Sequence, residues 1–285
     1  MVQLVQLRNR IKAIETIKKI THAMRLISMS THSRLKHKEE PLRLYHAAIN
    51  DLFNRIQQSV PEWTHPIMHP NQETQHTQLI ILIGSSRGLC GGFDTALFNY
   101  YQSYIAQHPR SKYAVIAVGK RAVGYCNDRG IGPIIKSFEE LSATTILSIA
   151  HAITHTIMHV QEPYGSVVAF SNHFKSFFNQ KPHASPIIPF STHSHANINS
   201  NPAVQDYAWE QNAHEILDTL AHQCVNATIQ HLLFQSLLAE LAARFLSMDA
   251  STRNAQTLLE NTKLDYNKLR QAKITKELAE LSGSF

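Results

Sequence analysis

The chain has 285 residues, of which 43% are hydrophobic, and a formal net charge of +6. This composition is typical of a folded protein and excludes a largely disordered chain. Three cysteines, Cys90, Cys126 and Cys224, lack CxxC spacing, so we expect neither disulfides nor a zinc knuckle, and a reducing, cytoplasmic setting. Arginines interrupt the N-terminus where a signal peptide needs an apolar core, and apolar runs such as 79–83 are too short for a bilayer span.

Both ends of the chain lack the residues that stop helices. No glycine or proline occurs in residues 1–40, and none occurs in residues 203–282. Because glycine loses backbone entropy in a helix and proline removes a backbone donor, their absence favours very long helices. At about 1.5 Å rise per residue, the C-terminal stretch could reach about 120 Å. We therefore expect two long terminal helices with a separate unit between them.

Residues of the C-terminal stretch follow a repeat of alternating steps of three and four. With three polar exceptions its positions are apolar: Leu217, Leu220, Cys224, Ala227, His231, Phe234, Leu238, Leu241, Phe245, Met248, Thr252, Ala255, Leu259, Thr262, Tyr266 and Leu269. A period of 3.5 residues keeps one stripe of a helix against a partner, which predicts a left-handed coiled coil. An amphipathic helix on a globular core, with a period of 3.6 residues, is the alternative.

The N-terminal stretch supplies the expected partner helix. Its repeat is carried by Leu4, Leu7, Ile11 and Ile14, then, after an irregular step, by Ile17, Ile20, Met24 and Ile27, and further on by Leu35, Leu42, Tyr45, Ile49, Leu52 and Ile56. Pro41 predicts a kink because it removes one helical donor. A middle unit that returns the chain near its point of departure would make the two helices antiparallel.

The longer C-terminal helix is expected to project beyond the N-terminus. Past Leu269 the repeat predicts seam residues at 273 and 276, but both are lysines. The apolar stripe shifts instead to Ile274, Leu278 and Leu281. The helix is therefore expected to continue as a tip that faces a different neighbour.

The middle of the chain changes to short apolar runs separated by turn residues. Strands are expected over 79–83, 114–118 and 166–170, and weakly over 187–190, with helices at about 93–107, 119–128 and 143–160. Strands that alternate with helices indicate a small α/β domain with a mostly parallel sheet. The fold class is therefore α/β, a long antiparallel coiled coil plus this domain, with boundaries expected at 1–60, 61–202 and 203–285.

The loop after the first expected strand, GSSRGLCGGF (84–93), invites a phosphate-binding interpretation. A phosphate-binding loop needs GxxxxGK[ST], and here the glycine spacing differs and no lysine follows. A tight strand-to-helix turn is the favoured interpretation.

Histidines form two sets with helical spacing, His151/His155/His159 and His214/Asp218/His222. Each set would line one helical face, a geometry that can hold zinc or nickel. Without an HExxH motif or a cysteine pair, solvated helix faces are favoured. No catalytic Ser/His/Asp or Cys/His constellation stands out, and we expect no catalytic residue, metal or cofactor.

Basic residues dominate the N-terminal helix. They are Arg8, Arg10, Lys12, Lys18, Lys19, Arg25, Arg34, Lys36 and Lys38. Such a stripe could bind nucleic acid with an affinity that falls with salt, although interleaved aromatic residues are missing. It could equally face an acidic protein surface. A coiled-coil adaptor or tether is a further alternative.

Three motifs resemble the family of the gamma subunit of F-type ATP synthase. The first is IKAIETIKKITHAMRLIS (11–28), and the second is RGLCGGF (87–93). The third is the C-terminal block ELAARFLSMDASTRNA (240–255) followed by YNKLRQAKITKELAEL (266–281). Together the matching segments cover roughly half of the chain, whereas residues 102–200 match in layout only.

The resemblance implies a rotor shaft. The end helices would form an antiparallel coiled coil whose tip enters a ring of three alpha and three beta subunits, with a Rossmann-like domain beside the lower shaft. The foot would join the epsilon subunit and the c-ring, with one copy per complex. Ion flow would turn the shaft, and its asymmetry would give each beta subunit a different face. The chain itself would be non-catalytic, bind no nucleic acid, and lie peripherally at the cytoplasmic face of the inner membrane.

The resemblance also implies contact residues for the ring. Met24 matches the part of the first helix that meets the acidic lever of a beta subunit. Arg270, Gln271 and Thr275 match the block where the second helix meets the beta catch loops, which is where the repeat breaks. Leu269 stands in place of a usual alanine and adds bulk there.

For the foot, the resemblance points to Tyr207 and Glu210, in the segment DYAWEQ. These residues align with the family's contacts to the epsilon subunit and the c-ring. Ser86 replaces a common aspartate before the Arg-Gly-Leu-Cys motif, and the abundance of histidine is also atypical of the family.

Overall fold

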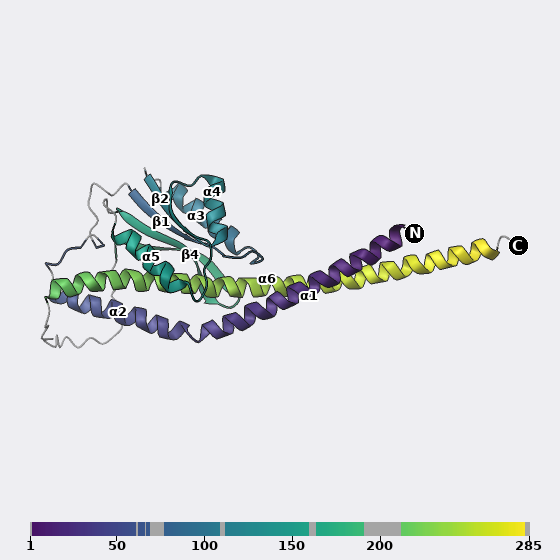
Figure 1. Ribbon diagram of the computed structural model, residues 1–285, viewed down its shortest axis with the longest axis horizontal. Coiled ribbons are helices and arrows are strands. Elements are labelled where there is room, and N and C mark those ends of the chain that lie inside the picture. Colours follow the sequence, from purple (N-terminus) through teal and green to yellow (C-terminus); the bar gives the residue numbers. More distant parts are fainter. Residues whose placement is uncertain are drawn as a thin grey trace. The chain divides into compact units, whose positions relative to one another are not determined.

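The computed structural model describes residues 2–60, 62–65, 67–68, 77–108, 112–159, 164–190 and 212–282. The chain divides into two compact units, and Figure 1 shows their elements. Unit 1 comprises Met1–Thr31, Leu89–Gly91 and Leu241–Phe285, and unit 2 comprises His32–Gly88 and Gly92–Glu240. Each terminal helix therefore contributes to both units. The three-part division at 1–60, 61–202 and 203–285 stays a prediction.

The N-terminal stretch forms two helices, α1 (Val2–Lys36) and α2 (Glu39–Ser59). The helix was expected to kink at Pro41, but the break lies earlier, at residues 37–38. Pro41 is the third residue of α2, in the first turn, where backbone N–H groups have no partner within the helix. The missing donor of proline therefore costs little at this position, and the chain bends before it.

The C-terminal stretch forms one helix, α6 (Ala213–Ser282), of 70 residues. The expected long helix is confirmed within this range, and the expected residues 203–211 lie outside the part that the structure describes. Glycine and proline are absent from the whole of α6, which removes the two commonest causes of helix interruption. Within the described ranges, no helical stretch combines the length and hydropathy that a bilayer span requires.

Unit 2 is built on a five-stranded sheet with the strand order β3-β2-β1-β4-β5. The strands are β1 (Thr77–Ile83), β2 (Lys112–Val118), β3 (Ile134–Phe138), β4 (Ser166–Ser176) and β5 (Asn179–Ile188). The first four are mutually parallel, and β5 pairs with β4 in the antiparallel sense. The expectation of a mostly parallel sheet is confirmed.

Both edge strands were poorly predicted from the sequence. No strand was expected at β3, whose residues are only half-buried in alternation and so form no apolar run. For β5 only residues 187–190 were expected, although the strand begins at Asn179. Pro182 and Pro186 argue against a strand in sequence, yet both are tolerated because β5 is an edge strand.

Three helices connect the strands: α3 (Phe93–Gln107), α4 (Lys120–Arg129) and α5 (Ile146–Met158). One face of the sheet packs against α3 and α4, where Leu82, Leu97 and Cys126 share a core. Side chains alternate along a strand, so Ile81 points to the other face. On that side, Thr154 of α5 lies 3.4 Å from Asn226 of α6, which places the first half of α6 beside α5 (Figure 1).

The helix α2 packs against the first half of α6 within unit 2. Its buried residues are Ile49, Phe53 and Ile56, and the thiol of Cys224 lies 3.9 Å from the carbonyl oxygen of Ile49. Tyr45 and Leu52, which were expected in this seam, are exposed. The expectation was wrong for these two positions, whereas it is confirmed for Ile49 and Ile56, and Phe53 takes the buried position next to Leu52.

Candidate functional site

Residues 2–31 of α1 and 241–282 of α6 pair side by side in unit 1, and we call them the paired segment. Ile11 and Ile14 pack against Ala255 and Leu259 to form its apolar core. Toward one end Glu15 contacts Lys263, and toward the other Lys18 contacts Gln256. As the residue number increases along α1, the number of the residue that it contacts on α6 decreases. The two helices are antiparallel, as the sequence predicted.

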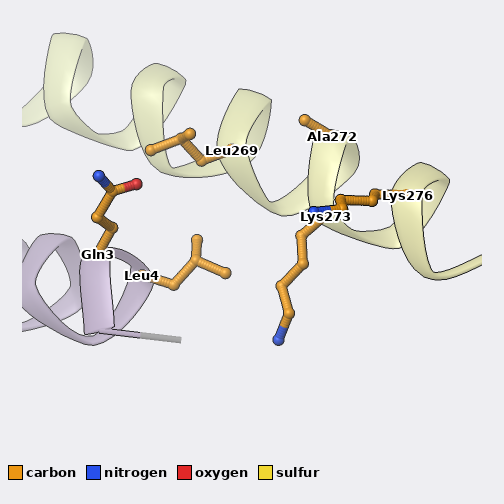
Figure 2. A pocket seen from close by; sticks show the side chains of 6 residues that line it. All are labelled: Gln3, Leu4, Leu269, Ala272, Lys273 and Lys276. Carbon is orange, nitrogen blue, oxygen red and sulfur yellow. The ribbon is translucent and has the colours of Figure 1, made fainter.

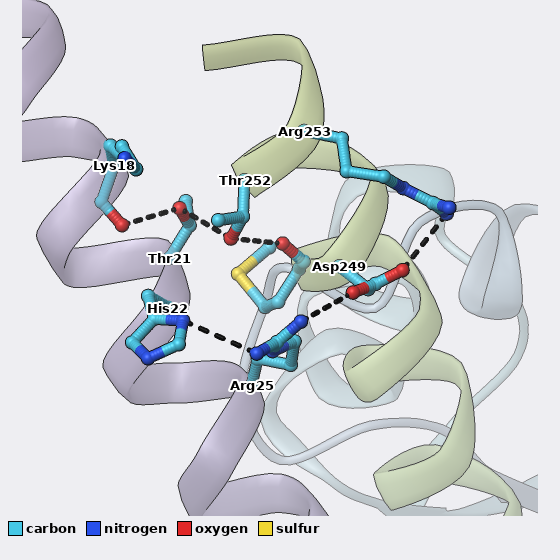
Figure 3. A network of polar contacts seen from close by, with 8 residues as sticks. Lys18, Thr21, His22, Arg25, Asp249, Thr252 and Arg253 are labelled. Carbon is cyan, nitrogen blue, oxygen red and sulfur yellow. Dashed lines mark hydrogen bonds and ion pairs between the residues drawn. The ribbon is translucent and has the colours of Figure 1, made fainter. Parts of the chain in front are cut away.

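Polar residues continue the seam beyond this apolar core (Figure 3). The hydroxyl oxygens of Thr21 and Thr252 lie 2.9 Å apart. One turn further, Arg25 Nη1 lies 2.7 Å from Asp249 Oδ1. Ser28 is buried and donates its hydroxyl hydrogen to the carbonyl oxygen of Met24 on the same helix. Such groups bury little apolar area, so specific bonds rather than hydrophobic contact fix this part of the pairing.

The seam of α1 differs from the one expected. Ile17, Ile20 and Ile27 were placed in it, but their exposed fractions are 52%, 54% and 65%, against 5% for Ile14. The steps of three and four continue unbroken from Ile14, but they run through polar residues: Lys18, Thr21, Arg25 and Ser28. An expectation based on apolar residues missed this seam because its positions beyond Ile14 are polar.

This register leaves a second row of residues on the outside of α1. Ile17, Ile20, Met24 and Ile27, which we call the outer stripe, are again spaced by three and four. Met24, predicted as a contact residue, is half-buried among its exposed neighbours. Large apolar side chains gathered on one exposed helix face are typical of a surface that binds another protein.

Near its end, α6 extends along the first turn of α1 (Figure 2). A cavity of about 260 Å³ there is lined by Leu4 with Gln3, and by Leu269, Ala272, Lys273 and Lys276. The side chain of Leu269 remains exposed, as do Ile274 and Leu278 beyond it. Past Leu269 the apolar stripe is therefore exposed, at Ile274 and Leu278.

The predicted contact residues Arg270, Gln271 and Thr275 are all exposed on this tip. The hydroxyl of Thr275 donates to the carbonyl oxygen of Gln271 within the helix, 3.0 Å away. The structure therefore brings these three residues together on one short stretch. The predicted foot residues Tyr207 and Glu210 lie outside the described residues.

The loop between β1 and α3 resembles a phosphate-binding loop only in its glycines. Oδ1 of Asp94, in the first turn of α3, accepts a hydrogen bond from Ser85 N at 2.8 Å, and Oδ2 accepts one from Ser85 Oγ at 2.6 Å. The start of a helix attracts anions, and here the chain's own carboxylate takes that position. A tight strand-to-helix turn is the arrangement found.

Within unit 1, the segment Leu89–Gly91 of the same loop belongs with the terminal helices. Gly91 has a φ of +61°, and a β carbon built on it would lie 3.6 Å from the β carbon of Ser247 on α6. That distance is an ordinary van der Waals contact, so the left-handed backbone of Gly91 is what accounts for the residue type in RGLCGGF.

The two histidine sets meet through one contact between α5 and α6. His155 and His159 stack at 4.1 Å between ring centroids, and His159 lies 6.0 Å from His222. Trp63 donates its indole hydrogen to Asp218 at 2.9 Å. Across the described ranges, no three histidine, cysteine or acidic side chains are grouped as metal ligands would be.

Comparison with known proteins adds sequence relatives over the whole chain. The sequence model of the ATP synthase family matches residues 3–285. A protein of Chlorobium limicola named ATP synthase gamma chain is 28% identical and covers 98% of this chain and 96% of its own length. One of Methylibium petroleiphilum with the same name is 27% identical, over 97% and 96% of the two chains.

Solved structures share the fold. A chain from the rotor of the Euglena gracilis mitochondrial ATP synthase has a TM-score of 0.69 at 14% identity, over 95% of this chain and 99% of that one. A chain of the central stalk and c-ring structure of the Tetrahymena thermophila enzyme has a TM-score of 0.60 at 17% identity, over 81% and 98%.

Proposed function

Because the chain belongs to the ATP synthase gamma-chain family, we propose that it is the central rotor shaft of an F1 sector. In this role it couples rotation of an ion-driven c-ring to ATP synthesis or hydrolysis in a ring of alpha and beta subunits. The family assignment does not favour the two alternatives, a coiled-coil adaptor and a nucleic-acid-binding hairpin.

The observation that carries this proposal is the exposed outer stripe beside a polar seam. Ordinarily the isoleucines of a coiled coil would fill its seam, but Ile17, Ile20 and Ile27 point outward. Their burial in a surrounding protein ring would stabilise the complex by roughly 25 cal/mol for each Å² of apolar surface removed from water. A polar seam holds the two helices in register without using these side chains.

The shaft's effect on the ring follows from its unequal sides. The outer stripe is apolar, and basic residues such as Lys12 and Lys19 lie on the exposed surface of the same helix. On α6, Leu258 and Leu264 are exposed among charged side chains. A beta subunit therefore meets a different surface at each rotational angle. Since a ligand shifts an equilibrium only through differential contacts, these surfaces would bias each subunit between its conformations.

Within this function we assign contact residues to two regions. Met24 of the outer stripe would meet the acidic lever of a beta subunit, and Arg270, Gln271 and Thr275 would meet the beta catch loops. The exposure of the last three on the tip supports this assignment. Tyr207 and Glu210 are proposed as foot contacts to the epsilon subunit and the c-ring.

The chain is proposed to be a non-catalytic subunit, present once in each complex. In the paired segment, ion pairs such as Arg25 with Asp249 and Lys263 with Glu15 join the two helices, which supports a mechanical role. Through its foot it would be held peripherally at the cytoplasmic face of the inner membrane.

Assembly tests the proposal. The full-length chain is mixed with purified F1 alpha and beta subunits, and the products are separated by size and assayed for ATP hydrolysis. A rotor shaft yields a complex of three alpha, three beta and one copy of this chain with ATPase activity. Failure to assemble, or assembly unaffected by leaving this chain out, would contradict the proposal.

A further inference from the structure

Two histidines stack where α2 packs against α6 in unit 2. The rings of His46 and His231 lie 5.1 Å apart with an interplanar angle of 13°. Nε2 of His46 lies 3.2 Å from the hydroxyl oxygen of Thr228 and 3.2 Å from Nδ2 of Asn50. The hydroxyl of Thr228 donates its hydrogen to the carbonyl oxygen of Cys224 at 2.8 Å, so its oxygen is an acceptor for the N–H group at Nε2 of His46.

Few negative charges face this pair. From α2, Glu39 and Arg43 act on His231, and from β4 His173 does so. His173 is itself influenced by Lys175 and by His183 of β5. The carboxylate of Glu39 already contacts Lys36 and accepts a hydrogen bond from Gln235 of α6 at 3.1 Å. A second proton on either ring would therefore meet mostly cations and histidines.

We propose that the His46–His231 pair is a proton-operated latch, which holds α2 on α6 while both rings are neutral and releases it when they are protonated. This inference goes beyond the rotor role and does not depend on it. Two stacked imidazolium rings in a half-buried seam repel each other and lose their hydration, so proton binding favours separation of the helices.

The direction of the pH effect follows from linkage. Burial, and then the neighbouring His231, lowers the pKa of His46 from 6.5 to about 4, and burial likewise lowers the pKa of His231. A ring released from the seam regains its ordinary pKa, so the open form binds protons more readily. The packing is stable above pH 6.5 and is lost as the pH falls toward about 4. For His46 alone, linkage predicts that the open population at pH 5 rises about 30-fold over that at pH 7.5.

A native thiol reports the opening. Cys224 is completely buried beneath α2, with its sulfur 3.9 Å from the carbonyl oxygen of Ile49. Cys126 is also buried, but it lies in the core between the sheet and the helices α3 and α4. Release of α2 exposes the first thiol and leaves the second one covered. The ratio of their labelling separates local release from global unfolding.

The experiment labels the full-length chain with 4,4′-dithiodipyridine, which reacts with thiols in acid, and locates the label by mass spectrometry. The labelling rate of Cys224, relative to that of Cys126, should rise at least about 30-fold between pH 7.5 and pH 5. An unchanged ratio would overturn the latch. A parallel rise at both thiols would also overturn it, because the whole unit would then be unfolding.

Two variants assign the effect to the pair. His46→Phe keeps an aromatic ring for stacking but cannot bind a proton, so the acid-induced rise should fall to a few-fold. Asn50→Asp places a carboxylate near Nε2, favours the charged ring in the packed state and should also reduce the rise. His214→Gln alters an exposed histidine of α6 and should leave the rise unchanged. A full rise in both His46→Phe and Asn50→Asp would refute the assignment to His46.

Discussion

Asp249 of α6 forms an ion pair with Arg25 of α1 and a second one with Arg253 of its own helix. The distances are 2.7 Å from Oδ1 to Arg25 Nη1 and 2.8 Å from Oδ2 to Arg253 Nη2 (Figure 3). One carboxylate therefore joins the two helices at Arg25, a seam position of α1 where a coiled coil usually places an apolar side chain. This bond sets which turn of α1 faces which turn of α6, and so determines which residues remain outside.

Replacing Asp249 by alanine should destabilise the paired segment by about 1–2 kcal/mol, because Arg25 would remain half-buried without its carboxylate. Urea unfolding of the full-length chain measures the change. Glu280→Ala, which removes the exposed partner of Lys276, is the control and should alter stability by less than about 0.5 kcal/mol. If the two variants lost the same free energy of unfolding, the ion pair of Arg25 with Asp249 would contribute no more to stability than an exposed pair.

The outer stripe should matter for assembly and hardly for folding. Ile17→Ser and Ile27→Ser alter exposed side chains, so each should change the unfolding free energy by less than about 0.5 kcal/mol. The same changes should weaken assembly with alpha and beta subunits. Ile14→Ala is the matched variant within the seam and should cost about 2–4 kcal/mol. If the serine variants assemble as well as the native chain, the outer stripe is not a ring contact.

The hydroxyl pair Thr21–Thr252 should show strong coupling. Thr21→Val alone leaves Thr252 facing an apolar group and should cost about 1 kcal/mol, as should Thr252→Val. The double variant exchanges the pair for an apolar contact and should be about as stable as the native chain. A double-mutant cycle from denaturant unfolding gives the coupling energy. If the double variant lost the sum of the two single losses in unfolding free energy, the two hydroxyls would act independently.

Removal of residues 270–285 should spare the fold and impair coupling. The described part of this tip is almost wholly exposed, and the apolar core of the paired segment, at Ile14 and Leu259, lies before it. Helical circular dichroism and the unfolding midpoint of the truncated chain are compared with the native values, together with ATP-driven ion transport in the reconstituted complex. Collapse of the fold on truncation would count against a projecting tip.

Gly119, which joins β2 to α4, should tolerate no side chain. Its φ is +91°, and a β carbon built on it would lie 2.3 Å from the carbonyl oxygen of Gly84. Gly119→Ala should destabilise unit 2 by about 2 kcal/mol or more, since both the backbone and the contact are strained. Thermal unfolding measures the loss. Gly124→Ala, where a β carbon would meet no atom within 4 Å, is the control and should be neutral or stabilising.

The sheet illustrates what could be predicted from sequence and what could not. The central strands β1, β2 and β4 are apolar runs, and a run of this kind is visible without knowledge of its neighbours. The edge strands β3 and β5 are covered on fewer sides, so half-exposed residues and prolines are permitted there. These two segments form strands because they pair with a neighbouring strand, and their own amino-acid composition does not indicate that pairing.

The candidate site divides in the same way. The absence of helix-stopping residues, the spacing by three and four, and the change of pattern past Leu269 were sufficient to predict long antiparallel helices with a tip. Two rows on α1 keep that spacing, one through Ile14, Thr21 and Ser28 and one through Ile17 and Met24. Only the tertiary structure decided between them, because the face that is buried depends on the bonds that Asp249 and Thr252 of the other helix can make.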